Sequence, residues 1–133
     1  MQIDETTAVL AKIQSFDNRT VDEVNILAWH EILEPFALQD CLQAVSKYFS
    51  KYSAWIMPAH ILDHVREIES ARRNTFHNGW HPSQADEQSG GWREVSKRLS
   101  RAVSTGELTP AAYQRYQDQN LTLDAALGLV AIQ

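Results

Sequence analysis

Hydrophobic residues recur every three or four positions along most of the chain, which is the spacing of helices that bury one face. Strand-like alternation is nearly absent, and glycine and proline are scarce. The pattern therefore predicts an all-α fold. It places four helices in the first half, starting near residues 4–7, 20, 36–38 and 58, and three shorter helices starting near residues 92, 110 and 122–124.

Several helix boundaries carry local signals. Thr20 and Glu23 have the spacing of a capping box, which predicts that a helix starts at Thr20. Thr109 followed by Pro110 predicts a capped start with proline at the first helical position. Gly106 is predicted to end the preceding helix, since glycine adopts the left-handed conformation that often closes a helix.

An apolar corner, residues 53–57, joins the third and fourth helices. It carries Trp55, Ile56 and Met57 through a loop, and we expect so apolar a loop to pack into the core. The alternative is that the cluster is exposed and marks a protein interface. Pro58 is predicted to open the fourth helix, because its fixed φ suits that position and its missing N–H costs nothing there.

The chain is predicted to have three parts. Residues 1–73 form a compact four-helix domain, because short connections favour antiparallel neighbouring helices. Residues 74–91 form a linker, since they are rich in Asn, Ser, Gln and Gly and have no helical period. Residues 92–133 form short C-terminal helices, the last of them reaching Val130, which bind a partner or pack on the bundle.

Four side chains of the predicted linker are unusual for such a segment. Phe76 and Trp80 are large and apolar, and His77 and His81 repeat a helical spacing beside them. Gly79 argues against a rigid helix there. These side chains either dock back on the bundle or form a short recognition segment.

Composition places the chain among soluble globular proteins, with 44% hydrophobic and 22% charged residues. The formal net charge of −5 argues against non-specific binding to nucleic acid as the main activity, because phosphate contacts need a concentrated basic surface. No apolar run has the length of a membrane span, and the N-terminus does not resemble a signal peptide. A single cysteine, Cys41, allows no intrachain disulfide. A cytoplasmic location is expected.

The first C-terminal helix carries a basic stripe beside its apolar one. Arg93, Lys97 and Arg101 recur every four residues, with Arg98 and Trp92 adjacent. The stripe is a candidate contact for DNA phosphates or for an acidic protein surface. The alternative is an ordinary solvated face of an amphipathic helix, and the carboxylates nearby dilute any positive field.

Two histidines four residues apart, His60 and His64, have the spacing of a shared metal site on a helix. The neighbouring sequence supplies no third ligand, so we expect a partly exposed helix surface that makes polar contacts with a partner. His30 and Glu31 begin a zinc-protease motif that fails, because Glu34 stands where the second histidine belongs. Cys41 is predicted to be a core thiol.

No catalytic chemistry is indicated by these patterns. The sequence contains no glycine-rich phosphate loop of the P-loop or dinucleotide type. Carboxylates are plentiful, but no pair is placed by sequence in an apolar pocket where it would serve as acid and base. The sequence therefore predicts a protein that is not an enzyme and that holds no metal ion and no cofactor.

The order of core positions resembles the N-terminal domain of the phage replicative-helicase loader and inhibitor family. The order is a Trp-x-x-x-Leu helix, an Ala-Val-x-x-Tyr helix, an aromatic-Met-Pro corner and an Ile-x-x-x-Val-x-x-Ile helix, across residues 7–73. The matching residues are structural: Trp29, Leu33, Val45, Tyr48, Trp55, Pro58, Ile61, Val65 and Ile68. No functional residue transfers, because the C-terminal part does not align by motif.

The resemblance implies a non-enzymatic accessory protein of DNA replication, encoded by a phage or prophage and acting in a bacterial host. Its partner would be a hexameric replicative helicase, delivered to an origin complex that includes an origin-binding protein. A loader without its own ATPase acts by binding alone. The resemblance also implies that the C-terminal portion, which is more helical here than a disordered tail, reaches the helicase.

Two other functions remain open at the level of sequence. One is a small DNA-binding or regulatory module that uses the basic helix 92–103, with affinity that falls as salt rises. The other is an oligomerisation domain whose C-terminal helices exchange between protomers. The oligomeric state itself is not predicted.

Overall fold

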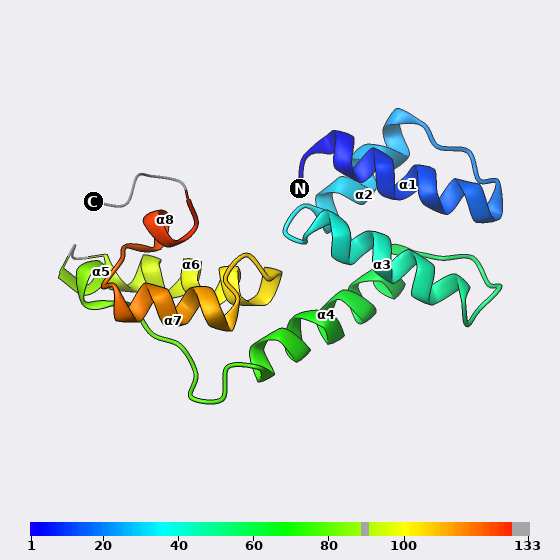
Figure 1. The fold of residues 1–133 in the computed structure, drawn as a ribbon. Helices are drawn as coiled ribbons and strands as arrows, with labels where there is room; N and C mark the ends of the chain where they lie inside the picture. The colour runs from blue at the N-terminus through cyan, green and yellow to red at the C-terminus, as the bar shows by residue number, and fades with distance from the viewer. Residues whose placement is uncertain (89–90, 129–133) are drawn as a thin grey trace. The chain divides into compact units, whose positions relative to one another are not determined.

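A computed structural model describes residues 1–88 and 91–128 of the chain. Within them the fold is all-α, as predicted, with no strand (Figure 1). None of the helices in this part of the chain is long and apolar enough to cross a lipid bilayer. The helices are α1 (Ile3–Asp17), α2 (Glu23–Leu33), α3 (Leu38–Phe49), α4 (Pro58–Asn74), α5 (Gln84–Gln88), α6 (Trp92–Thr105), α7 (Pro110–Asp118) and α8 (Leu123–Ala126).

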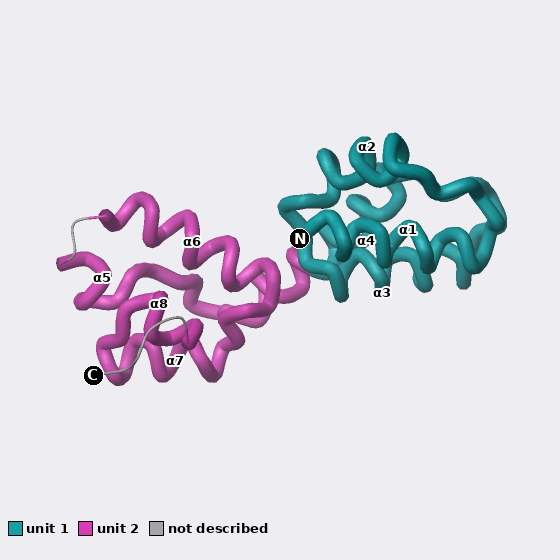
Figure 2. Tube along the Cα trace, turned by 90° about the horizontal axis from the view of Figure 1, so that it is seen from above, with its two compact units in different colours: residues 1–68 teal, residues 69–133 magenta. Residues whose placement is uncertain are grey.

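The chain forms two compact units, residues 1–68 and residues 69–133 (Figure 2). The boundary falls within α4, whose first part belongs to unit 1 and whose last part belongs to unit 2. The sequence predicted a boundary at residue 73, at the end of this helix. The structure moves it earlier, because the last turns of α4 contact α6 through Glu69, Arg72 and Arg73.

Unit 1 is a four-helix domain in which α1 packs against both α2 and α3. Each helix supplies apolar side chains at helical spacing to a single core, as the sequence pattern predicted. Cys41 lies in this core as a buried free thiol. The buried core residues are Val9, Leu10, Ile13, Trp29, Leu33, Cys41, Ala44, Val45, Ile56, Ile61 and Val65.

The start of α2 differs from the prediction. The N-cap residue is Asp22, whose carboxylate accepts a hydrogen bond from the backbone N–H of Asn25 at 2.8 Å. Thr20 lies two residues too early, because the backbone before it is held by α1. The Gln14 amide donates to the carbonyl of Arg19 at 3.0 Å, and the Asp17 carboxylate accepts from the Arg19 N–H at 3.1 Å. The predicted Thr20–Glu23 capping box is therefore wrong.

Other helix boundaries follow their local signals. Pro58 is the first residue of α4. Gly106 ends α6 in the left-handed conformation, with φ 83°. Thr109 caps α7, since its hydroxyl accepts from the backbone N–H of Ala112 at 3.2 Å. The predicted extension of the last helix to Val130 lies outside the described residues.

Unit 2 includes the segment that was predicted to be a linker. Phe76 and Trp80 pack against the buried residues of α6, α7 and α8. The indole N–H of Trp80 donates to the hydroxyl of Ser100 at 2.9 Å, and α5 follows a few residues later. The described part of residues 74–91 is therefore a structural layer of unit 2. Its aromatic side chains pack on the C-terminal helices, whereas the sequence suggested the four-helix bundle.

Tyr116 holds this layer in place through buried hydrogen bonds. Its hydroxyl accepts from the backbone N–H of Ser83 at 2.8 Å and donates to the carboxylate of Asp86. The same carboxylate accepts from the N–H of Leu123, at the start of α8. Burial and the bond to Asp86 together raise the pKa of Tyr116 to about 12. The Tyr116 network therefore joins α5, α7 and α8.

Candidate functional site

The predicted basic stripe on α6 is largely matched by carboxylates. Arg98 forms an ion pair with Asp124 of α8. Arg101 lies 3.2 Å from a carboxylate oxygen of Glu69 on α4, and Lys97 lies 3.8 Å from Glu94 on α6 itself. These pairings reduce the field that the stripe would present to phosphate groups.

Trp92 and Arg93 lie at the start of α6. The guanidinium carbon of Arg93 is 5.8 Å from the centroid of the exposed Trp92 ring. Trp92 is exposed, whereas the apolar residues Val95, Leu99 and Val103 further along α6 are buried. The first residue of the helix lies beyond the end of the unit 2 core.

His60 and His64 line an open groove of about 520 Å³ in unit 1, between α3 and α4. One wall carries Lys47 and Lys51, and the other carries Asp63. An aromatic pair also lines it, since the ring of Tyr48 lies against that of His60 with 4.8 Å between centroids and 31° between their planes. The groove therefore combines side chains of both charges with aromatic rings.

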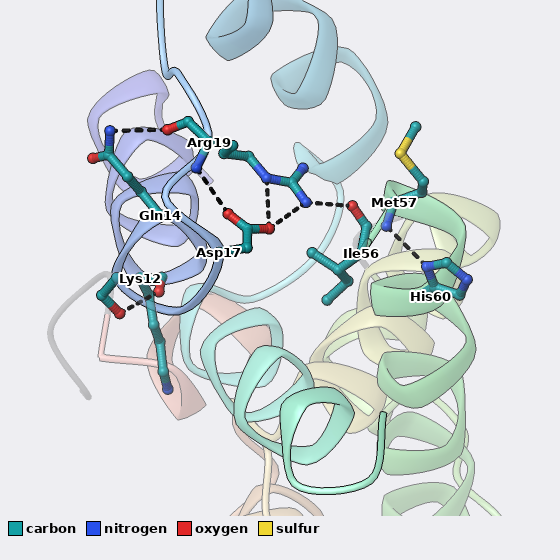
Figure 3. A network of polar contacts seen from close by, with 8 residues as sticks. Lys12, Gln14, Asp17, Arg19, Ile56, Met57 and His60 are labelled. Carbon is teal, nitrogen blue, oxygen red and sulfur yellow. Dashed lines mark hydrogen bonds and ion pairs between the residues drawn. The ribbon is translucent and has the colours of Figure 1, made fainter. Parts of the chain in front are cut away.

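Each histidine has one ring nitrogen in a local contact. Nδ1 of His60 accepts from the backbone N–H of Met57 at 2.8 Å, which caps the start of α4 (Figure 3). Nδ1 of His64 lies 3.4 Å from the carboxylate of Glu67. Among residues 1–88 and 91–128 there is no cluster of three or more His, Cys, Asp or Glu side chains arranged for a metal ion.

Arg19 forms the polar centre of unit 1, on the turn between α1 and α2. Its Nε and Nη2 donate to the carboxylate of Asp17 at 2.9 and 2.6 Å, and Nη2 also donates to the carbonyl of Ile56 at 2.9 Å (Figure 3). The guanidinium lies over the rings of Trp55 and Trp29. Arg19 therefore ties the apolar corner before α4 to the turn after α1.

Asp17 responds to this environment. Burial by itself raises the pKa of its carboxyl group, but the hydrogen bonds and positive charge of Arg19 outweigh burial and hold the pKa below the ordinary value of 3.8. Asp17 therefore stays ionised near neutral pH as the counter-ion of Arg19. The sequence analysis identified neither residue, since their only signal is an Asp-x-Arg spacing within a turn.

Only part of the apolar corner, residues 53–57, packs into the core as predicted. Ile56 is fully buried, whereas Trp55 and Met57 are 57% and 48% exposed. Successive side chains of an extended segment point to opposite sides, so only the middle one of the three enters the core. Trp55 and Met57 instead line a cavity of about 330 Å³ beside Arg19, Asn25 and Trp29.

The outward face of α2 carries several exposed apolar side chains. Val24 is 75% exposed, Leu27 49% and Ile32 43%. These positions, with Ala28 between them, lie on one face of the helix, while Trp29 and Leu33 on the opposite face are buried in the core. The α2 outer face, as we call residues 24, 27, 28, 31 and 32, is thus held rigidly from behind.

Comparison with protein-family models, with curated proteins and with solved structures finds no match to this chain.

Proposed function

We propose that this protein is a non-enzymatic adaptor that acts by binding another protein through the α2 outer face. The observation that carries the proposal is the exposure of Val24, Leu27 and Ile32 on one side of a helix whose other side is anchored in a core. Isolated exposed apolar side chains are ordinary, but a contiguous apolar helix face is typical of protein interfaces.

Anchoring favours recognition, because a face that is already ordered loses little conformational entropy when a partner covers it. Trp29 and Leu33 fix α2 from its inner side. His30, on the flank of the helix, lies within hydrogen-bond distance of Thr6 on α1, with 2.7 Å between Nδ1 and Oγ1. The helix therefore meets a partner without rearrangement of the fold.

The partner that we propose is a hexameric replicative helicase. This part of the proposal comes from the resemblance of residues 7–73 to phage helicase loaders and inhibitors. The binding site departs from that resemblance, which implies that the C-terminal portion reaches the helicase, because the exposed apolar helix face lies on α2. The protein would then act in the cytoplasm of a bacterial host, as a phage or prophage product that escorts the helicase to an origin complex. An origin-binding protein is a further proposed partner.

Gel filtration of the full chain with a purified replicative helicase hexamer tests the proposal. We expect the two to elute together, and we expect the Val24→Ser/Leu27→Ser variant to elute alone. Both positions are exposed, so the variant should keep the circular dichroism spectrum and thermal midpoint of the wild type.

Trp92→Ser is the matched control, since Trp92 is 57% exposed, between the 49% of Leu27 and the 75% of Val24, and lies in unit 2. It should still elute with the helicase. Absence of wild-type co-elution at micromolar concentrations would remove the helicase from the proposal. Loss of binding in Trp92→Ser but not in the α2 variant would move the binding site to α6.

A further inference from the structure

We propose that the α2 outer face receives a basic amphipathic helix of the partner protein, with lysine or arginine beside an apolar seam. This inference rests on the proposed function, because it specifies the chemistry of the partner at the same surface.

The stretch of sequence that contains α2 carries several carboxylates and no basic side chain other than His30. Residues 20–46 contain no lysine or arginine. The same stretch places four exposed carboxylates on α2 and at its two ends. These are Asp22, Glu23, Glu31 and Glu34.

Two of these carboxylates have a structural role and two do not. Asp22 caps the helix, and Glu23 lies in its first turn, where a negative charge is favoured by the helix dipole. Glu31 and Glu34 lie at the opposite end, where the dipole disfavours a negative charge. A lysine or arginine of a partner would attract Glu31 and Glu34, and this attraction would offset their unfavourable interaction with the helix dipole.

The described part of the chain contains no ion pair to the side chain of Glu31 or Glu34. The amino group of Met1 contacts the backbone carbonyl of Glu34 and not its carboxylate. His30 is engaged with Thr6. The two carboxylates are therefore available to cationic side chains from outside.

The shape of the face favours a helix as the occupant. α2 has 11 residues, about three turns, and is about 16 Å long at ~1.5 Å per residue. Val24, Leu27 and Ile32 form a ridge with the small Ala28 at its middle, where a second helix can approach closely. Apolar residues three and four apart on the partner would cover this ridge, and flanking cations would reach Glu31 and Glu34.

A second copy of this chain fits the face less well. An antiparallel pair of α2 helices, centred on Ala28, would bring Asp22 and Glu23 of one copy toward Glu31 and Glu34 of the other. Four carboxylates would then meet at each end of the interface. Repulsion between them opposes self-association through this face.

A pair of designed peptides tests the inference. Both form an amphipathic helix of about three to four turns with a leucine seam, and one has arginine at the flanking positions where the other has glutamate. The full chain, labelled with nitrogen-15, is titrated with each peptide, and the perturbed backbone amides are mapped by NMR. We expect the arginine peptide to perturb amides 24–32 and the glutamate peptide to leave them unchanged.

Charge removal on the protein gives the second arm. Glu31→Gln/Glu34→Gln should weaken binding of the arginine peptide about fivefold, as expected for two partly exposed ion pairs, and added salt should reduce the difference. The matched control is Asp63→Asn/Glu87→Gln, which removes two exposed carboxylates that do not belong to α2. It should bind as the wild type does.

Three results would overturn the inference. They are equal binding of the two peptides, equal binding by the two double variants, and a wild-type dimer in sedimentation that Val24→Ser/Leu27→Ser makes monomeric. The last would assign the face to a second copy. If the helicase binds the wild type and Glu31→Gln/Glu34→Gln with equal affinity, the basic helix is wrong while the proposed function stands. If only the peptide binds, the helicase assignment fails instead.

Discussion

The guanidinium carbon of Arg19 lies 4.0 Å from the centroid of the Trp55 ring, and the two residues are brought together from the turn after α1 and the corner before α4. This contact explains how Trp55 is exposed and still held in place. One face of the ring stacks on a cation that is itself fixed by Asp17 and by the carbonyl of Ile56. Arg19 is thus the link between the two segments.

Replacing Arg19 by lysine should destabilise unit 1. The charge remains, but one ammonium cannot reproduce the paired bonds to Asp17 together with the bond to Ile56 and the stack on Trp55. We expect Arg19→Lys to lower the free energy of unfolding by about 2–3 kcal/mol, measured by urea denaturation followed by circular dichroism. The reverse exchange at an exposed site, Lys47→Arg, should change it by less than about 0.5 kcal/mol. Equal midpoints for the two variants would show that Arg19 does not hold the corner.

The ion pair between Asp17 and Arg19 should make stability depend on acid in a defined direction. Because the pKa of Asp17 is lower in the folded state, its contribution is present above the ordinary value of 3.8 and is lost as pH falls through the folded value. Asp17→Asn should therefore be less stable than the wild type by about 1–2 kcal/mol at neutral pH. The gap should close in acid below the ordinary value.

Urea denaturation of both proteins across that pH range measures the gap. The same substitution at the exposed Asp63 controls for loss of one negative charge. A gap for Asp17→Asn that stays constant with pH would mean that the charge of Asp17 does not stabilise the fold.

Tyr116→Phe should weaken unit 2. The substitution removes a buried donor to Asp86 and a buried acceptor for the N–H of Ser83, and we expect a loss of about 2–3 kcal/mol at neutral pH. Tyr52→Phe, at an exposed tyrosine, is the control. An equal effect of the two substitutions in thermal unfolding would contradict the role of the Tyr116 network.

The same tyrosine predicts alkaline instability. Its pKa of about 12 in the folded state is higher than the ordinary value of 10, so the unfolded chain releases the proton first as pH rises. Stability should fall between these two values in the wild type. Tyr116→Phe should lack this part of the slope, which denaturation curves at increasing pH would reveal.

Gly106 and Gly79 provide a matched pair of left-handed positions. Both have positive φ, 83° and 72°, but an added Cβ at Gly106 would lie 2.9 Å from Nε of Arg72, whereas the space around Gly79 is open. Gly79→Ala should lower the free energy of unfolding by about 1 kcal/mol, through backbone strain alone. Gly106→Ala should lower it by about 2–3 kcal/mol, because Arg72 must also lose its 2.9 Å hydrogen bond to the carbonyl of Ser104. Equal costs in thermal unfolding would mean that Arg72 moves aside freely.

Signals that act within a few residues were read correctly from the sequence. Pro58, Gly106 and Thr109 set helix boundaries through φ preferences and a side-chain cap, which need no distant partner. The prediction that Thr20 caps α2 was wrong, because Asp22, two residues later, is the N-cap residue. The backbone just before Thr20 is held by a hydrogen bond from Gln14 of α1 to the carbonyl of Arg19.

Residues 74–91 show why composition misled. Trp80 and Ser83 look like parts of a polar linker until they meet Ser100 and Tyr116, which are 20 and 33 residues further along the chain. The basic stripe was misjudged for the same reason. Arg98 and Arg101 pair with carboxylates that are 26 and 32 residues away in the sequence. No local pattern reports such pairings.

The sequence by itself determined that the chain is all-α and where most helices lie, because periodicity and caps act along the chain. The tertiary structure alone decided which apolar side chains stay in water. Val24 and Trp29 lie on the same apolar helix, and Trp55 and Ile56 are neighbours, yet in each pair one is exposed and the other buried. Burial depends on which faces α1, α3 and α4 cover, and that choice is made only when distant segments pack.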